Sequence, residues 1–421
     1  MRLLWLSNMA PSPVLQKLGK TSRGGLWMDH VLKDLRCRQD LKFHLLFPFS
    51  EAAAGNLDPV CSYAAFEKQA PTVCDPEQEA FFLRQLREFQ PDVVHIWGTE
   101  FGHTLNMLKA CQQEGLLDRT VISIQGLCSI YARHYNEGIP VEVLNHNTVR
   151  DLLRHDGLLQ QQAVFKQRGE NEKEAFRLCR HVIGRTHWDR ACARVLNPNA
   201  EYHFCNETMR EEFYEGSWSY DTCVKHRIFA SSCIYPIKGF HYLLEALAEV
   251  RKRYPDATLC VPGKNPVAEN FSQKLRQDGY AAYLEKLLKD LNLTDAVNFL
   301  GSLSGEKMKE NYLKANVFVL PSTIENSPNS LGEAMLLGVP CAAADVGGVT
   351  TMLESGREGI VFQGTAPYML SDAIEKIFAM EEQAEAMGKA AKAHAEKTHD
   401  PAENLRDLLH IYEEIAGGSK V

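Results

Sequence analysis

The stretch NVFVLPSTIENSPNSLGEAMLLGVPCAAADV, residues 316–346, holds two short apolar runs separated by a polar loop and an amphipathic segment. Short apolar runs rich in β-branched and aromatic residues predict buried strands. The segment between them predicts a helix that ends near Gly338, because Pro340 forbids its continuation. A strand–helix–strand unit of this kind indicates a parallel sheet covered by helices.

The same alternation extends along the chain in both directions. Strand-like runs occur at 2–8, 42–49, 93–98, 120–126, 181–186 and 202–206, and again at 227–232, 258–263, 297–302, 316–322, 340–346 and 359–364. Longer amphipathic segments separate them; in one, Leu243, Leu244, Leu247 and Val250 recur at helical spacing. The sequence therefore predicts an α/β fold of two doubly wound, Rossmann-like domains that face a cleft.

The polar stretch 206–226 predicts the domain boundary, because it lacks strong periodicity. We expect an N-terminal domain over 1–215, a C-terminal domain over 216–396 and a closing helix over 397–421 that returns toward the N-terminal domain. Residues 128–177 carry helix and loop signals without a clear strand. An insertion of this length in a doubly wound domain is more often functional than filler.

Bulk composition narrows the function classes. The 421 residues are 45% hydrophobic and 24% charged, with a formal net charge of −8, so a broad attraction to nucleic acid is not expected. The 12 cysteines show no zinc-type spacing and favour a reducing compartment. The N-terminal apolar run is too short for a signal peptide, and no segment is long enough to span a membrane. We expect a cytoplasmic protein that at most contacts a membrane from the cytosolic side.

The loop ENSPNSLGE places Glu325 and Glu333 around a predicted helix start. Ser330 and Glu333 fit an S-x-x-E capping box, which explains Glu333 but not Glu325. The alternative is a diphosphate held by the free backbone N–H groups of Ser330, Leu331 and Gly332. Each carboxylate would then accept hydrogen bonds from the hydroxyls of a ring on one side of the diphosphate. A nucleotide sugar has this composition.

The segment PSTIENSPNSLGEAMLLGVPCAAADVGG resembles the donor-site signature of retaining glycosyltransferases with the GT-B fold, particularly glycosyltransferase family 4. The similarity is strongest over roughly 226–365. The resemblance implies that Glu325 contacts the transferred sugar, that Glu333 holds the ribose, and that Lys238 of the Lys238-Gly239 pair neutralises the leaving diphosphate. It also implies an acceptor on the N-terminal domain, no cofactor and no catalytic metal; the chain contains no D-x-D motif.

Two positions depart from the family pattern. Cys233 stands where the family usually has an arginine, so a phosphate cation must come from elsewhere, with Arg227 and Arg185 as candidates. Gln125 stands where many members have a histidine before Gly126. In a retaining front-face mechanism the departing phosphate takes the acceptor's proton, so no protein base is required, and electrostatic stabilisation of the leaving group carries the catalysis.

The remaining candidates have both a structural and a functional interpretation. Gly24-Gly25 follows the first strand and either forms a turn or lets the backbone approach the substrate. His95 lies within a strand, where a structural role is commoner than an acceptor-side one. Arg185 borders the expected cleft. The insertion carries arginines and apolar pairs that suggest a solvated cover, an acceptor platform or a face for anionic lipid; these are Arg133, Arg150, Arg154, Arg168, Leu152-Leu153 and Leu158-Leu159.

We therefore expect a retaining, metal-independent hexosyltransferase-type enzyme that moves a sugar from a nucleotide diphosphate sugar to a hydroxyl acceptor, such as a lipid-linked glycan, in polysaccharide or glycoconjugate synthesis. A UDP-sugar is the expected donor only because it is common in the family. The alternatives are a nucleotide-sugar epimerase or glycoside phosphorylase on the same fold, and a non-catalytic nucleotide-sugar-binding subunit.

Overall fold

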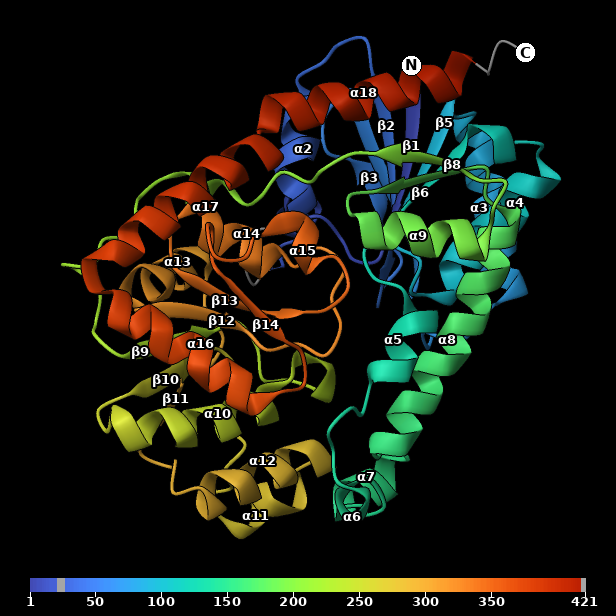
Figure 1. The fold of residues 1–421 in the computed structure, drawn as a ribbon. Coiled ribbons are helices and arrows are strands. Elements are labelled where there is room, and N and C mark those ends of the chain that lie inside the picture. Colours follow the sequence, from blue (N-terminus) through green and yellow to red (C-terminus); the bar gives the residue numbers. More distant parts are fainter. Residues whose placement is uncertain (21–26, 418–421) are drawn as a thin grey trace. The chain divides into compact units, whose positions relative to one another are not determined.

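The computed structural model describes residues 1–20 and 27–417, and these form two compact units. The N-terminal unit comprises Met1–Ile130, Phe165–Arg210 and His399–Val421, and the C-terminal unit comprises Tyr131–Val164 and Glu211–Thr398. Each unit contains one sheet with helices on its faces (Figure 1). The prediction of two Rossmann-like α/β domains is confirmed.

The sheet of the N-terminal unit has eight strands in the order β3-β4-β2-β1-β5-β6-β7-β8, and only the β3–β4 pair is antiparallel. Its strands are β1 (Arg2–Ser7), β2 (Lys42–Phe49), β3 (Ala54–Asn56), β4 (Cys61–Glu67), β5 (Val93–Trp97), β6 (Thr120–Ser123), β7 (His181–Gly184) and β8 (Glu201–Phe204). The sequence predictions missed β3 and β4. In β4, CSYAAFE mixes Ser and Ala with aromatic residues and has no clear period, so only pairing with β2 makes it a strand.

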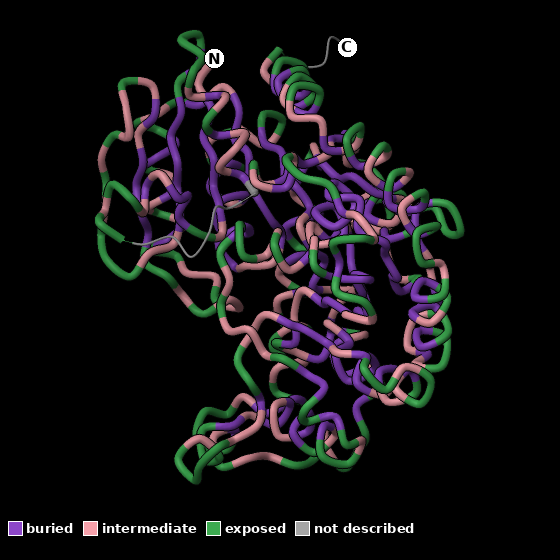
Figure 2. Tube along the Cα trace, turned by 90° about the vertical axis from the view of Figure 1, so that its left-hand side faces the viewer, coloured by how far each residue is buried: buried purple, intermediate pink, exposed green. Residues whose placement is uncertain are grey.

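Helices cover this sheet, and the last of them closes the unit. They are α1 (Ser12–Lys17), α2 (Trp27–Arg36), α3 (Pro76–Phe89), α4 (Gly102–Gln113), α9 (His187–Leu196) and α18 (Pro401–Gly417), and a short 3-10 turn, η1 (Leu117–Arg119), precedes β6. Helix α18 buries Leu408, Ile411 and Tyr412 in the same apolar cluster as Trp5 of β1. Figure 2 shows buried segments, in purple, close to the N-terminus. The predicted closing helix therefore packs on the N-terminal unit.

The sheet of the C-terminal unit has six parallel strands in the order β11-β10-β9-β12-β13-β14. They are β9 (Arg227–Ala230), β10 (Thr258–Val261), β11 (Val297–Phe299), β12 (Val317–Leu320), β13 (Cys341–Asp345) and β14 (Ile360–Gln363). The helices are α10 (Phe240–Arg253), α11 (Phe271–Leu275), α12 (Gly279–Asp290), α13 (Gly305–Lys314), α14 (Asn329–Leu336), α15 (Val349–Met352), α16 (Pro367–Met380) and α17 (Ala384–Thr398). On α10, the predicted apolar face Leu243, Leu244, Leu247 and Val250 is fully buried.

Residues 128–177 are helical, as expected, but they divide between the units. The helices are α5 (Cys128–His134), α6 (Val141–Leu144), α7 (Val149–Arg154) and α8 (Leu158–Leu178). Residues 131–164 pack with the C-terminal unit, where Ile139 and Leu158 join the core that contains Tyr280. The predicted placement of the whole insertion in the N-terminal domain differs from this division. Apolar residues on short helices show only that they are buried, not which surface covers them.

Candidate functional site

The C-terminal sheet reverses its strand order between β9 and β12. From β9 the chain builds outward through β10 and β11, and from β12 it builds in the other direction through β13 and β14. The carboxyl ends of the two strands that flank such a switch point are where doubly wound sheets bind ligands. Lys238 follows β9 and Glu325 follows β12, so the fold brings the two predicted residues to this point (Figure 1).

Lys238 is held by a turn that only glycine can complete. It ends a 3-10 turn, η3 (Pro236–Lys238), and Gly239 follows with φ +63°. A Cβ on Gly239 would lie 1.9 Å from the carbonyl oxygen of Pro321, and Thr323 N donates to Ile237 O at 2.8 Å. Lys238 therefore lies just before α10. The hydrogen bond and the close approach at Gly239 therefore hold the turn after β9 against the loop after β12.

Lys238 and Glu325 form the central ion pair of the site. Lys238 Nζ lies 2.6 Å from Glu325 Oε1, and Ser322 Oγ donates to the same oxygen at 2.8 Å. The Glu325 side chain is 8% exposed and that of Lys238 is 25% exposed. Burial alone would lower the pKa of Lys238, but the charges of Glu325 and Tyr235 outweigh it and leave that pKa raised. Lys238 is therefore a fixed cation at the switch point.

The backbone of Glu325 is positioned by the glycine turn after β13. Gly347 has φ +53°, and a Cβ there would lie 1.8 Å from the carbonyl oxygen of Glu325. Gly348 N donates to that oxygen at 3.1 Å. The Gly347-Gly348 pair after β13 thus contacts the backbone of Glu325 closely and fixes the position of Glu325 in the site.

Helix α14 begins one residue before Ser330, which changes the predicted helix cap and the predicted set of free backbone N–H groups. Its N-cap is Pro328, which has no side-chain capping bond, so the expected capping box between Ser330 and Glu333 is wrong. The N–H groups of Leu331 and Gly332 both reach Pro328 O, at 2.9 and 3.3 Å. The first two helical residues, Asn329 and Ser330, lack a carbonyl four residues back within the helix and present the N–H groups of this end.

Glu333 lies one turn further along α14 and is held from α13. Tyr312 OH donates to Ser330 O at 3.0 Å and approaches Glu333 Oε2 at 3.3 Å. Glu333 is 5% exposed. The two carboxylates predicted from E-x7-E are therefore both buried at this end of the sheet, and Glu325 pairs with Lys238.

The two arginines proposed as replacements at Cys233 lie in different units. Arg227 is the first residue of β9, so it lies at the amino end of the sheet, where it donates to Asn311 Oδ1 at 2.6 Å. Arg185 belongs to the N-terminal unit and pairs with Glu207. The suggestion of Arg227 is therefore corrected, and that of Arg185 stays a prediction.

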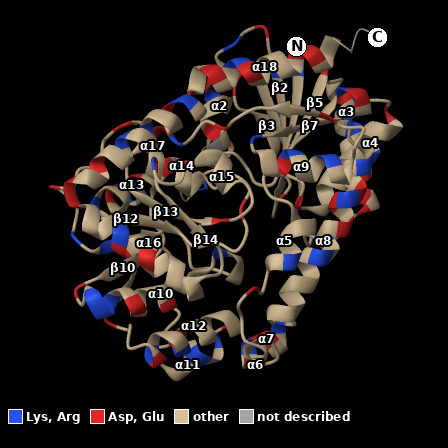
Figure 3. Ribbon diagram, in the orientation of Figure 1, with Lys and Arg blue, Asp and Glu red and all other residues tan. Residues whose placement is uncertain are grey.

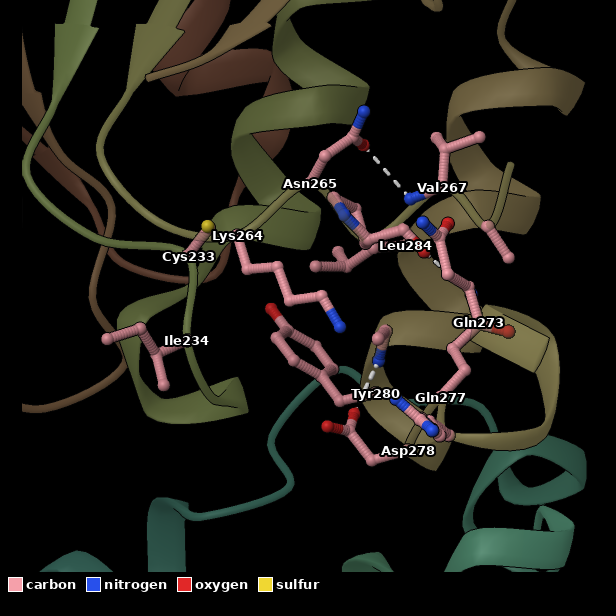
Figure 4. Close-up of a pocket in the computed structure, with 14 residues that line it drawn as sticks. Cys233, Ile234, Lys264, Asn265, Val267, Gln273, Gln277, Asp278, Tyr280 and Leu284 are labelled. Carbon is pink, nitrogen blue, oxygen red and sulfur yellow. Dashed lines mark hydrogen bonds between the residues drawn. The ribbon is translucent and has the colours of Figure 1, made fainter. Parts of the chain in front are cut away.

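A cavity of about 170 Å³ adjoins Cys233 and is lined by Ile234, Lys264, Gln277 and Tyr280 among others. Figure 4 shows Lys264 extending through it toward Tyr280. Lys264 follows β10 and has no ion-pair partner among the residues that the structure describes, and a Cβ on neighbouring Gly263 would lie 2.9 Å from Cys233 Sγ. Sequence spacing missed this cation, because it follows a different strand from Cys233.

In the N-terminal unit, Gln125 and Arg185 meet at the carboxyl ends of β6 and β7. Gln125 Nε2 donates to Glu207 Oε1 at 2.6 Å, and Arg185 Nη2 donates to Gln125 Oε1 at 3.3 Å. Arg185 and Glu207 also form a buried ion pair. Arg185 Nε and Glu207 Oε2 are buried atoms that no protein hydrogen bond satisfies. Glu207, which follows β8, was not predicted; only the sheet order brings it to Gln125.

His95 is a core residue. It is fully buried in β5, its Nδ1 lies 2.5 Å from Tyr412 OH, and its Nε2 lies 2.7 Å from Ser123 Oγ. Burial lowers its pKa well below the ordinary value. Because both ring nitrogens have internal partners, the structural interpretation of His95 is favoured over an acceptor-side role.

The remaining candidates are placed as follows. Gly24 and Gly25 lie outside the described residues. Arg168 donates to Glu100 O at 2.6 Å and lies over the Phe101 ring, and Arg150 pairs with Asp156. These arginines therefore brace the insertion helices, whose basic residues are visible in Figure 3. In the described part of the chain, no helix is both long and apolar enough to cross a membrane.

The segment that carries Lys238, Lys264 and both glutamates has a sequence match. Residues 225–394 match the family described as Glycosyl transferases group 1. We call these residues the group 1 region. It begins just before β9 and ends within α17, so it includes the whole C-terminal sheet. The predicted resemblance is confirmed at the level of this family for the region and of the GT-B fold for the chain.

Relatives with a stated activity match over a similar part. A D-inositol 3-phosphate glycosyltransferase of Paenarthrobacter aurescens (strain TC1) is 30% identical over 173 residues, which cover 41% of this chain and 40% of that one. A GDP-mannose-dependent alpha-(1-6)-phosphatidylinositol monomannoside mannosyltransferase of Mycolicibacterium smegmatis is 28% identical over 191 residues, 44% and 45% of the two chains. The chain thus matches less than half the length of these relatives.

Solved structures resemble the whole chain at low identity. Sucrose-phosphate synthase from Thermosynechococcus elongatus has a TM-score of 0.73 at 15% identity and covers 100% of both chains. Anabaena Alr3699/HepE, solved in complex with UDP and glucose, has a TM-score of 0.66 at 16% identity and covers 98% of this chain and 100% of that one. At this identity the likeness establishes the fold.

Proposed function

We propose that this protein is a retaining, metal-independent glycosyltransferase that moves a sugar from a nucleotide diphosphate sugar to a hydroxyl acceptor. The observation that carries the proposal is the meeting of Lys238 and Glu325 at the switch point of the group 1 region. A cation beside a carboxylate, with helix N–H groups nearby, suits a ligand that has both phosphates and ring hydroxyls.

In the proposed reaction the acceptor hydroxyl oxygen bonds to the anomeric carbon while the bond from that carbon to the diphosphate oxygen breaks. The departing phosphate oxygen receives the hydroxyl proton on the same face, so the configuration is retained. Lys238 stabilises the charge that grows on the diphosphate, and fixed charges of this kind give large rate effects. Glu325 Oε2 has no hydrogen-bond partner among the described residues, which leaves it for a hydroxyl of the transferred sugar.

Charge balance indicates a second cation for the diphosphate, and we assign that part to Lys264. Glu325 and Glu333 bring two carboxylates close to Lys238 in the described part of the site, so a second cation would help to hold a diphosphate. Lys264 has no ion-pair partner in the described chain and extends into the cavity beside Cys233, on the strand next to β9. It would thus replace the cation that Cys233 does not supply.

For the donor and the acceptor we propose chemical classes rather than single compounds. A UDP-sugar agrees with the ligand of the Anabaena structure, whereas the Mycolicibacterium relative is named as GDP-mannose-dependent, so both donors belong in a test. That relative's named acceptor is a phosphatidylinositol glycolipid, which supports a lipid-linked acceptor reached from the cytoplasmic side. On α7, exposed Val149, Leu152 and Leu153 would suit contact with a lipid surface.

The test begins with a thermal-shift screen of nucleoside diphosphates and their sugars, because a ligand that binds the native state stabilises it by mass action. Donors that bind are then incubated with glycolipid acceptors in EDTA, and the anomeric configuration of the product is read by NMR. We expect transfer with retention. Lys238→Ala and Glu325→Ala should each reduce turnover at least a hundredfold in folded protein. Normal transfer by both would refute the assignment, and an isomerised donor without acceptor would indicate an epimerase.

Lys264→Ala tests the second cation. It should weaken binding of a nucleoside diphosphate at least tenfold and leave the nucleoside itself unaffected, while Lys264→Arg retains binding. Arg276→Ala, on the same cavity, is the matched control. Equal binding by Lys264→Ala and the wild type would remove Lys264 from the site without removing the glycosyltransferase assignment.

A further inference from the structure

Two histidines and a glutamate converge at the amino ends of β7 and β8. His181 opens β7 and lies in register with Glu201, the first residue of β8. Because side chains alternate along a strand, His203 shares the face of Glu201. His181 Nδ1 lies 3.1 Å from His203 Nε2 and 3.5 Å from Glu201 Oε2, and one ligand atom from each residue falls within 4.8 Å of the others.

Each imidazole also has a polar neighbour outside the cluster. The backbone of Asp118 lies near the His181 ring and favours its protonated form, which raises its pKa against the larger effect of burial. On α18, Glu414 Oε2 lies 3.9 Å from His203 Nδ1 and favours a proton there. With the protons on the two outer nitrogens, each ring would turn a lone pair toward the other. Metal-binding histidines are arranged in this way, with the outer N–H on a carbonyl or carboxylate.

We propose that His181 Nδ1, His203 Nε2 and the Glu201 carboxylate bind a divalent transition metal ion, with Zn²⁺ as the preferred species. In that tautomeric state the two lone pairs, 3.1 Å apart, repel unless a cation lies between them. Nitrogens about 2.0–2.1 Å from a tetrahedral Zn²⁺ stand about 3.3 Å apart, which is close to the observed separation. Imidazole with one carboxylate suits zinc, whereas Mg²⁺ and Ca²⁺ prefer oxygen ligands alone.

The place of the cluster in the fold assigns it a structural role. It lies at the amino ends of β7 and β8, whereas Gln125 and Arg185 lie at the carboxyl ends of the same sheet. The ion would join the two outer strands directly and α18 through Glu414. The Glu201 side chain is 60% exposed, so the fourth ligand position opens toward water. The proposal does not depend on the glycosyltransferase assignment.

Metal binding by the full-length protein tests this inference. After EDTA treatment and its removal, the protein is titrated with Zn²⁺ against a chromophoric chelator, and with Co²⁺ to record the visible bands of a tetrahedral site. We expect one ion per chain. His203→Gln should abolish binding, Glu201→Gln should weaken it at least tenfold, and Glu414→Gln about tenfold. His410→Gln is the matched control, because this exposed histidine also lies beside Glu414, at 3.3 Å.

Thermal unfolding gives a second readout that stays informative if His203→Gln fails to fold. Zn²⁺ should raise the unfolding midpoint of the wild type and of His410→Gln, and should raise that of Glu201→Gln, whose altered side chain is exposed, by clearly less. Absence of Zn²⁺ and Co²⁺ binding by the wild type would overturn the proposal. Equal binding by wild type and both ligand variants would do the same. In either case a shared proton, rather than a metal, bridges the two rings.

Discussion

The Lys238–Glu325 pair allows a quantitative test of how the site is built. At 2.6 Å, two unit charges attract with about 6 kcal/mol at an effective dielectric constant of about 20, before the cost of removing them from water. Removing one partner of a buried pair typically costs about 3–5 kcal/mol, because the other charge stays buried alone. Lys238 is a quarter exposed, so we expect the low end, about 3 kcal/mol, for Lys238→Met.

A double-mutant cycle separates the pair from its surroundings. Glu325→Gln should cost about 2 kcal/mol, and the double variant about 3 kcal/mol rather than the sum, which gives a coupling energy near 2 kcal/mol. Unfolding in urea is followed by hydrogen exchange in β9 and β12, so that the C-terminal unit is measured by itself. The exposed pair Lys252–Glu249 is the control and should show no measurable coupling. Additive costs at Lys238 and Glu325 would refute the reasoning.

Three further outcomes follow from the contacts. Gly347→Ala should reduce sugar transfer at least tenfold by displacing Glu325. Gly356→Ala is the control, because Gly356 also has a positive φ but no atom lies within 4 Å of its Cβ position. This control should cost only about 1 kcal/mol of stability and retain transfer. Burial raises the pKa of Glu172 from 4.5 to about 7. Its stabilising contribution is therefore complete below pH 4.5 and is lost, by about 3 kcal/mol, as pH rises through 7. In urea titrations the stability deficit of Glu172→Gln relative to the wild type should shrink as pH rises, and a constant deficit would contradict this. His95→Gln should lower the unfolding free energy by about 2 kcal/mol while the folded fraction retains the wild-type KM for acceptor, and a raised KM would restore the acceptor-side role.

The local residue pattern was sufficient to predict a strand or a helix end where all the residues concerned lie in one element. The apolar runs predicted all six strands of the C-terminal sheet. The signal is clearest in β12, which is apolar throughout because it is buried on both faces. The helix end at Gly338 was predicted because its φ of +73° favours glycine. The start of α14 was not, because Pro328 can precede a helix as well as enter it, and the S-x-x-E match pointed to the wrong cap.

The sequence did not predict which residues from different strands lie together. Lys264 reaches the cavity beside Cys233 only because β10 lies next to β9, and Glu207 reaches Gln125 only because β8 follows β7 and β6 in the sheet. The proposed metal ligands illustrate the same limit. An E-x-H pair on a strand is a weak signal, and its partner His181 lies on the neighbouring strand, twenty positions before Glu201.

The sequence by itself determined the two α/β units, the Lys-Gly turn and the pair of glutamates that flank a helix start, since these depend on side-chain period and backbone conformation within a few residues. Tertiary structure decided which strands are neighbours, and hence that Lys238 contacts Glu325, that the 131–164 segment packs on the C-terminal unit, and that α18 covers the N-terminal sheet. Strand order and helix docking arise from long-range burial, which local residue patterns do not encode.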